Sequence, residues 1–112
     1  MSSSNAPETQ LMKAVLGPLL DDFQHWFGRS ITLLEAETID FLGEHRQQDL
    51  LARVREAQQL VSASQALFQA TDSEAGVDVS VVMSWHRLVH ECWNVAMQFR
   101  QQQTPNKLPE DN

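Results

Sequence analysis

Four residues near the carboxyl end of the chain have side chains that could bind a ligand or a partner. His86, His90, Trp93 and Met97 follow one another at steps of four, three and four, so they share one face of a helix. Two imidazoles four residues apart are a common arrangement for holding a transition metal or a haem iron. Indole and thioether groups are typical of the centre of a protein interface. This face therefore suits either a bound cofactor or a protein partner.

The cofactor interpretation lacks a complete ligand set. Cys92 lies about 200° around the helix from His90, so it cannot join the two histidines at one ion. Further candidate ligands fall on other segments: His25, His45, Asp21, Asp22 and Glu44. The simpler alternative is that both imidazoles border the core or are solvated. We therefore expect no cofactor, and we keep binding of a metal, haem or tetrapyrrole through His86 and His90 as the alternative.

The interface interpretation rests on apolar residues beyond those that a small bundle needs. Trp93 lies away from the apolar stripe of its segment, where it would be partly exposed unless the loop with Ile39 and Phe41 covers it. The first segment also has a second apolar face, formed by Leu20, Phe27, Ile31 and Leu34. That face would suit a homodimer or a partner. Equally, it would arise in a helix that packs against both others.

Catalytic motifs are absent from the sequence. It contains no phosphate-cradling glycine loop, no HExxH, no nucleophile elbow and no CxxC. The single cysteine, Cys92, excludes an intrachain disulfide and falls on an apolar stripe, where we expect it to be buried and inert. Trp26 and Trp85 also fall on apolar stripes and are expected in the core. We therefore expect a protein that is not an enzyme.

Three segments must position these residues. In each of them apolar residues recur at alternating steps of three and four, the repeat of packed helices. The stripes, in which Ser30 and Ser64 take the place of an apolar residue, are Met12, Leu16, Leu19, Phe23, Trp26, Ser30 and Leu33; Leu50, Val54, Ala57, Val61, Ser64 and Phe68; and Val82, Trp85, Val89, Cys92, Ala96 and Phe99. They predict an all-α antiparallel three-helix bundle with heptad-like packing and helices over about residues 8–35, 44–70 and 79–103.

The chain length of 112 residues fits one domain, which we place at residues 7–103. The polar, proline-containing ends, residues 1–6 and 104–112, are expected to be disordered. Pro18 interrupts the first helical segment, so that helix either kinks there or divides in two. We favour one kinked helix, because the apolar register continues across Pro18.

The charge of the chain limits its partners. Eight basic and fifteen acidic residues give a formal charge of −7, which repels phosphate backbones, so we expect no nucleic-acid partner. No secretory signal and no run of about twenty apolar residues occurs, so we expect no membrane span and a cytoplasmic location.

Short stretches from residue 7 to residue 100 carry a family resemblance. They include Pro7-Glu8-Thr9, Lys13-Ala14-Val15-Leu16, Trp26-Phe27-Gly28-Arg29-Ser30, Asp49-Leu50-Leu51-Ala52-Arg53-Val54, Phe68-Gln69-Ala70-Thr71-Asp72, Trp85-His86 and Glu91-Cys92-Trp93. In these stretches the chain resembles a family of small cyanobacterial proteins, an uncharacterised helical domain of unknown function. The resemblance implies a cyanobacterial cytoplasm, with peripheral association at thylakoids and their photosynthetic complexes, and it transfers no catalytic residue.

These observations lead to one expected function and one alternative. We expect a non-catalytic interaction or assembly factor that docks through Trp93, Met97, His86 and His90, linked to cyanobacterial photosynthetic complexes. The alternative is a small carrier that holds a metal, haem or tetrapyrrole at His86 and His90.

Overall fold

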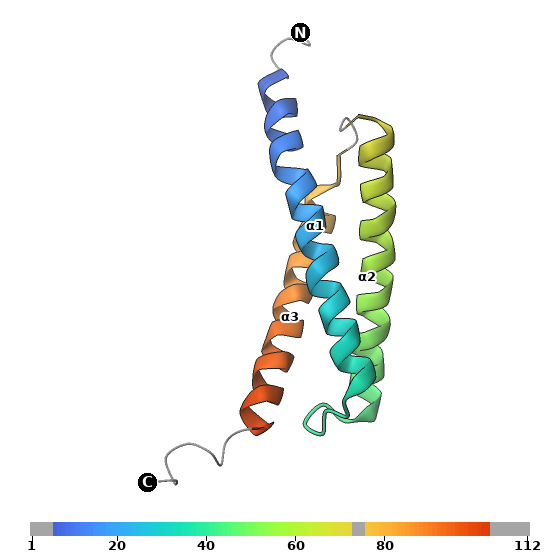
Figure 1. Cartoon of the computed structure of the whole chain (residues 1–112), viewed down its shortest axis with the longest axis vertical. Coiled ribbons are helices and arrows are strands. Elements are labelled where there is room, and N and C mark those ends of the chain that lie inside the picture. Colours follow the sequence, from blue (N-terminus) through green and yellow to red (C-terminus); the bar gives the residue numbers. More distant parts are fainter. Residues whose placement is uncertain (1–5, 73–75, 104–112) are drawn as a thin grey trace, which may run out of the picture.

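A computed structural model describes residues 6–72 and 76–103, with side chains from residue 14 onward. These residues form three α-helices: α1 (Ala6–Ala36), α2 (Glu44–Ala70) and α3 (Val79–Gln103), without a strand in either described range (Figure 1). α1 and α3 run in the same direction, α2 runs in the opposite direction, and α1 lies between the other two in this view. The predicted three-helix bundle is therefore confirmed, with helix ends within about two residues. Ala6, expected to be disordered, is the first residue of α1, and the other residues of both predicted disordered ends, 1–5 and 104–112, lie outside the described residues.

α1 passes through Pro18 without a break. A proline inside a helix removes one backbone hydrogen bond and crowds the carbonyl four residues earlier. The apolar contacts on both sides of Pro18 offset that cost, since Leu16 and Leu20 are both buried. One continuous helix is thus confirmed, and the bend expected at Pro18 stays a prediction.

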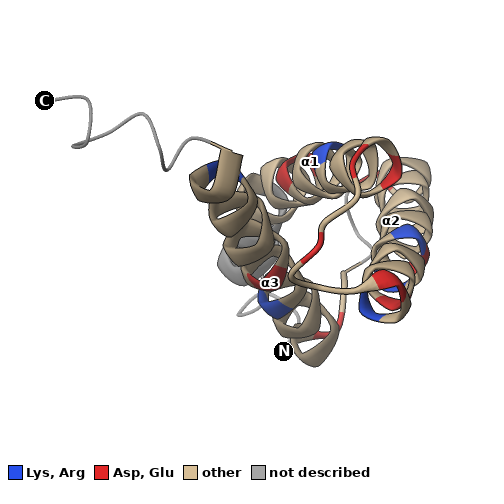
Figure 2. Cartoon of the chain, turned by 90° about the horizontal axis from the view of Figure 1, so that it is seen from below, with Lys and Arg blue, Asp and Glu red and all other residues tan. Residues whose placement is uncertain are grey.

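The core lies on the common axis of the three helices, which Figure 2 shows end-on. Every side chain buried there is apolar, and no polar or charged side chain is buried within the described ranges. The buried residues of α2 follow the predicted stripe: Leu50, Val54, Ala57, Val61 and Phe68. α3 buries Trp85, Val89 and Cys92 of its predicted stripe and Val95 in addition, whereas Val82, Ala96 and Phe99 are only half-buried.

The buried face of α1 differs from the predicted stripe. Leu20 and Phe27 are 0% exposed, whereas Leu19, Trp26 and Leu33 are only half-buried. α1 contacts both other helices, so its buried arc lies between the two apolar faces and takes residues from each. Trp26 and Leu33 lie beside α3 instead of filling the centre.

The connection between α1 and α2 is built into the core. Ile39 and Leu42 are buried, as expected from a loop that folds over one end of the bundle. The side chain of Gln47 holds this loop in place: its Oε1 accepts from the Ile39 N–H at 2.9 Å, and its Nε2 donates to the carbonyls of Leu34 at 2.9 Å and Glu37 at 2.7 Å. The last turn of α1 thus gains partners for carbonyls that a helix end leaves unpaired.

α2 and α3 are joined by an ion pair across the bundle surface. Both terminal nitrogens of Arg53 donate to the carboxylate of Glu91, at 3.0 and 2.9 Å. The arginine holds the pKa of Glu91 below its ordinary value. Because both side chains are more than two-fifths exposed, the pair contributes at most about 1 kcal/mol.

Replacing Glu91 should therefore have a small and pH-dependent effect. A carboxyl with a lowered folded pKa stabilises the fold above its unfolded pKa, about 4.3, and this contribution is lost as the pH falls through the folded pKa. We expect Glu91→Gln to lower the free energy of unfolding by at most about 1 kcal/mol at pH 7. The difference from the wild type should vanish at acid pH. Urea unfolding across pH 7 to 2.5 measures it, with Glu56→Gln at an exposed position of α2 as control; a constant difference would contradict the assignment.

Candidate functional site

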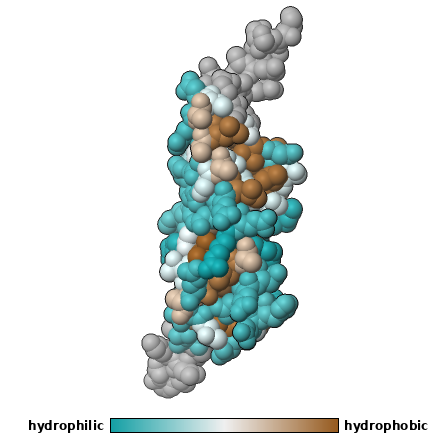
Figure 3. All heavy atoms as spheres, turned by 90° about the vertical axis from the view of Figure 1, so that its right-hand side faces the viewer, coloured by the Kyte–Doolittle hydropathy of each residue, from teal (hydrophilic) through white to brown (hydrophobic). Residues whose placement is uncertain are grey.

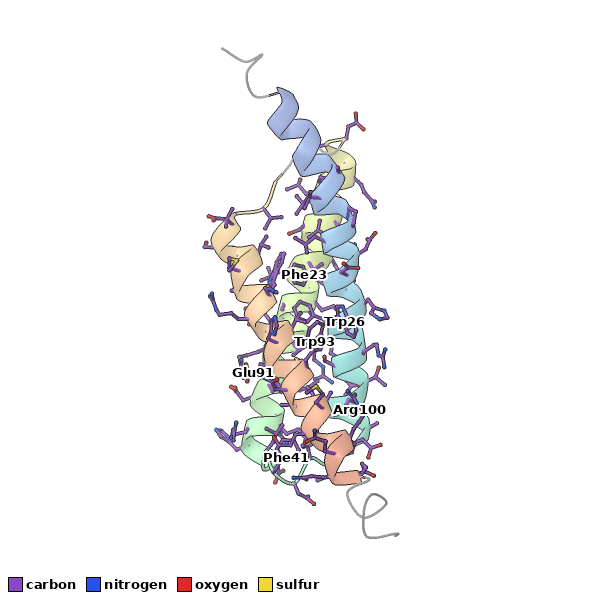
Figure 4. The ribbon with its side chains drawn as sticks, turned by 90° about the vertical axis from the view of Figure 1, so that its left-hand side faces the viewer. Phe23, Trp26, Phe41, Glu91, Trp93 and Arg100 are labelled. Atoms are coloured by element: carbon purple, nitrogen blue, oxygen red, sulfur yellow. The ribbon has the colours of Figure 1, made fainter. Side chains whose placement is uncertain are left out.

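A row of five aromatic rings crosses from α1 to α3, and we call it the aromatic row. Its ring centres are 4.9 Å apart for His25 and Trp26, 5.2 Å for Trp26 and Trp93, 5.3 Å for Trp93 and His90, and 4.7 Å for His90 and His86. The two indoles meet edge to face at 80°, a favourable geometry for aromatic pairs. Figure 4 shows Trp26 and Trp93 together between the two helices.

Sequence spacing predicted the α3 half of this row, since His86, His90 and Trp93 share one face. It did not predict that Trp26 and His25 continue the row on α1. Trp26, expected in the core, is half-buried and lies at the junction of the two helices. The row therefore joins a predicted surface to residues that the sequence had placed elsewhere.

The predicted face of α3 is exposed and longer than expected. Met83 and Val79, which are 48% and 74% exposed, extend the face toward the start of α3. Trp93 and Met97 on the same face are 41% and 51% exposed. His86 and His90 are exposed between them. We call this set the α3 stripe: Val79, Met83, His86, His90, Trp93 and Met97. In the sequence, the steps of four and three continue from His86 back through Met83 to Val79, so this extension of the face was predictable.

The loop does not cover Trp93, although the sequence left that alternative open. Ile39 lies in the core with 1% exposure, and Phe41 lines a separate hollow with Arg46 and Glu91. Figure 4 shows Phe41 near the end of the bundle, away from Trp93.

The second predicted surface does not exist in the folded chain. Leu20 and Phe27 are 0% exposed, and Ile31 is half-buried against the core. The prediction of a docking face is therefore wrong for Leu20 and Phe27, because their side chains are buried between the helices. The basis for a homodimer through this face is removed with them.

The opposite side of the bundle, which carries α2, has exposed apolar residues of its own. Figure 3 shows hydrophilic surface around separate hydrophobic areas on that side. Leu60 and Leu67 are the large apolar side chains of α2 with about half of their surface exposed. Two such residues seven positions apart are ordinary for a protein surface.

A groove of about 350 Å³ lies between α1 and α3 beside the two tryptophans, and we call it the α1–α3 groove. Its walls and floor are mainly apolar, and the floor is formed by core residues of all three helices: Leu34, Leu50, Cys92 and Val95. Arg29 and Arg100 line it from opposite helices. The volume falls within the range of about 300–1,000 Å³ that small-molecule sites occupy.

Two side chains that line the groove, Cys92 and Ser30, end in a thiol and a hydroxyl. Burial raises the pKa of the Cys92 thiol, which keeps it protonated and weakly nucleophilic. The Ser30 hydroxyl donates to the Trp26 carbonyl at 2.9 Å, so it is held by its own helix. Neither residue is arranged as an activated nucleophile.

The histidine pair supplies only part of a metal site. The rings of His86 and His90 are 4.7 Å apart, close enough to approach one ion. Across residues 6–72 and 76–103, however, no group of three or more His, Cys, Asp or Glu side chains could hold a metal. His45, Asp21, Asp22 and Glu44 are exposed elsewhere on α1 and α2.

Among the described residues, none of the three helices has the long apolar run that would let it span a membrane.

Comparison with known proteins identifies the family and nothing more specific. No curated protein and no solved structure is significantly similar to the chain. Residues 6–101 match the family described as "Protein of unknown function (DUF2605)". Because the match covers nearly the whole bundle, the chain belongs to the DUF2605 family, a family without an assigned function.

Proposed function

We propose that this protein is a non-catalytic interaction or assembly factor that binds a protein partner through the α3 stripe. The observation that supports the proposal is the stripe itself: six exposed or half-exposed positions without a formal charge, four of them large apolar side chains. Large exposed apolar side chains gathered on one helix face, here on both sides of the two histidines, are typical of a binding surface.

The spacing of the α3 stripe suits a helical partner. Alternating steps of four and three present one straight row of side chains, into which the residues of a second helix can interdigitate. From Val79 to Met97 the row is about 27 Å long. Trp93 is the expected energetic centre, because tryptophan dominates interfaces and its ring is already held by Trp26.

The resemblance to small cyanobacterial proteins suggests the cellular setting. We propose a partner among the photosynthetic complexes, reached from the cytoplasm at the thylakoid surface. The partner is therefore sought in a cyanobacterial lysate, and the variants are placed on the α3 stripe.

The test introduces charge on the stripe and, separately, beside it. Met83→Glu with Met97→Glu should abolish capture of a stoichiometric partner from native cyanobacterial lysate, because carboxylates cannot be buried against an apolar partner. Ser84→Glu with Gln98→Glu adds the same charge at exposed positions off the stripe and should retain the partner. Mass spectrometry of soluble and membrane fractions identifies what is bound. Equal capture of the partner by both double variants would refute the proposal that the α3 stripe binds it.

A second candidate is a ligand carrier that holds a metal, haem or tetrapyrrole at His86 and His90, next to Trp93. The 4.7 Å approach of the two rings favours it. Protein purified without a histidine tag from its own host should then contain metal or absorb visible light, and His86→Ala should remove either signal. A colourless, metal-free preparation that also fails to take up haem would exclude this candidate.

A further inference from the structure

We propose that the α3 stripe binds the α3 stripe of a second copy of this chain, in antiparallel orientation and around one shared zinc ion. His86 and His90 of both copies hold the ion, so that four imidazoles surround it. A second copy is then the partner that the α3 stripe binds, and to that extent the inference rests on the proposed function. It goes further because the metal site is complete only when two chains meet.

The α3 stripe has the symmetry that a contact between two copies needs. Its six positions are spaced evenly about Leu88. A two-fold axis at Leu88 therefore brings each position opposite its mirror position in the other copy. The resulting contacts are Val79 with Met97, Met83 with Trp93, and His86 with His90. Apolar side chains thus meet apolar side chains, and histidines meet histidines.

The sizes of these side chains favour the antiparallel pair over a parallel one. In a parallel pair each position meets itself, so Trp93 would face Trp93 and Val79 would face Val79. The two helices would then be held far apart at one end and close together at the other. The antiparallel pair places the large Trp93 opposite the smaller Met83 at both ends of the contact, which keeps the helices evenly spaced.

The α3 stripe lies on a part of the chain where two copies repel each other little. The whole chain has a formal charge of −7, so two copies repel each other overall. From Val79 to Met97, however, α3 carries one arginine, Arg87, and one glutamate, Glu91, and this span has no net formal charge. In Figure 2, α3 occupies one corner of the bundle, and neither of the other two helices covers its outer side. A second copy can therefore reach the stripe.

The histidine pair of one chain is half of a zinc site. Zinc in a structural site takes four ligands in a tetrahedral arrangement, and two imidazole nitrogens bound to it at about 2.1 Å lie about 3.4 Å apart. The ring centres of His86 and His90 are 4.7 Å apart, which suits such a pair. Within residues 6–72 and 76–103, no third His, Cys, Asp or Glu side chain of the same chain completes the ligand set. The second copy supplies the two imidazoles that are needed.

The size of the contact explains why the ion is needed. The α3 stripe is about 27 Å long, and a helix contact of this length and about 10 Å width buries on the order of 400 Å² per chain. A standard interface buries about 800 Å² per partner. The apolar contact alone is therefore weak, and zinc bound by both copies supplies the remaining stability.

Zinc should convert the untagged protein from a monomer to a dimer. Sedimentation equilibrium in EDTA and in zinc chloride measures the dissociation constant of the dimer. At a free zinc concentration of about 100 times the dissociation constant of the ion, mass action should tighten the dimer about 100-fold. The dimer isolated by gel filtration should contain one zinc ion for two chains. A monomer with one zinc ion per chain, or a mass that does not change with zinc, would overturn the proposal.

Histidine variants test which side chains hold the ion. His86→Ala and His90→Ala each remove two of the four ligands, one from each copy, so association in zinc should return to its level in EDTA. His45→Ala, at an exposed position on α2, is the matched control and should dimerise as the wild type does. An equal loss of the dimer in His45→Ala would place the bridging ion on another surface and refute the site.

A pair of opposite charges tests the antiparallel orientation. Val79→Lys and Met97→Glu each place a charge opposite an apolar residue of the other copy, so each should weaken the zinc dimer about tenfold. In the double variant the new ammonium of one copy meets the new carboxylate of the other, and the affinity should return to within about threefold of the wild type. In a parallel pair the double variant would bring like charges together. A double variant that binds more weakly than either single variant would therefore refute the antiparallel arrangement.

The failure of this inference can be told apart from the failure of the docking function. A protein that stays monomeric in zinc, yet loses a different lysate partner through Met83→Glu with Met97→Glu, would overturn the zinc-bridged pair and leave the docking function intact. A zinc-dependent dimer, together with a lysate from which the α3 stripe captures only further copies of the chain, would support the pair and identify its partner.

Discussion

Phe27→Ala should lower the free energy of unfolding by about 3–5 kcal/mol. Phe27 is 0% exposed, and its ring stacks on Phe23 with the ring centres 5.8 Å apart, so its removal leaves a cavity in the middle of the core. The neighbouring rings are held by other contacts, including the edge-to-face pair of Phe23 and Trp85, and cannot collapse freely into the space. Equilibrium unfolding in urea, followed by circular dichroism, measures the loss.

The matched control is an apolar residue on the surface. Leu67 is 55% exposed on α2, so Leu67→Ala should change the free energy of unfolding by about 0.5 kcal/mol or less. This comparison also tests the burial of Phe27 between the helices. A Phe27→Ala protein that kept its stability but lost an oligomeric state would contradict the burial of Phe27.

Gln47→Ala should cost about 2 kcal/mol, which is large for a half-buried polar residue. Its amide makes three hydrogen bonds that connect the end of α1, the following loop and the first turn of α2. Alanine leaves the Ile39 N–H and the carbonyls of Leu34 and Glu37 without these partners, and Ile39 is 1% exposed. Urea unfolding measures the cost, and faster amide hydrogen exchange at Ile39 locates it.

Two variants test whether the amide itself is responsible. Gln48→Ala, at an exposed position in the same turn, should be nearly neutral. Gln47→Glu should fail to restore stability, because a carboxylate can accept from Ile39 but has no N–H for the two carbonyls. Full stability of Gln47→Glu would mean that the three bonds do not hold the loop.

The sequence was sufficient to predict the three helices because apolar periodicity is a local signal. The apolar stripe of α2 lies in the core as predicted, and the loop residues Ile39 and Leu42 are buried as expected. Trp85, Val89 and Cys92 of the α3 stripe predicted for the core are buried too, whereas Val82, Ala96 and Phe99 are only half-buried. The rotation of α1 was not predictable in the same way. Both of its faces are apolar, so its position depends on where the other two helices pack.

The functional surface was predicted only in part, for the same reason. The exposure of His86, His90, Trp93 and Met97 follows from their place beside the apolar stripe of one helix. The aromatic row and the α1–α3 groove depend on two helices that are far apart in the sequence. Gln47 carried no signal either, because a glutamine on a helix reveals nothing of the loop that it will hold.

The contact between α1 and α3 has a consequence for how the protein folds. α1 and α2 are joined by a short loop and can pair as a local hairpin, whereas Trp26 meets Trp93 only after a much longer stretch of chain has been closed. We therefore expect α3 to pack last, in a step that completes the tertiary structure and forms the groove. A molecule that binds in the groove can bind only the folded chain. By mass action it would therefore shift the equilibrium between the unfolded and folded states toward the folded state.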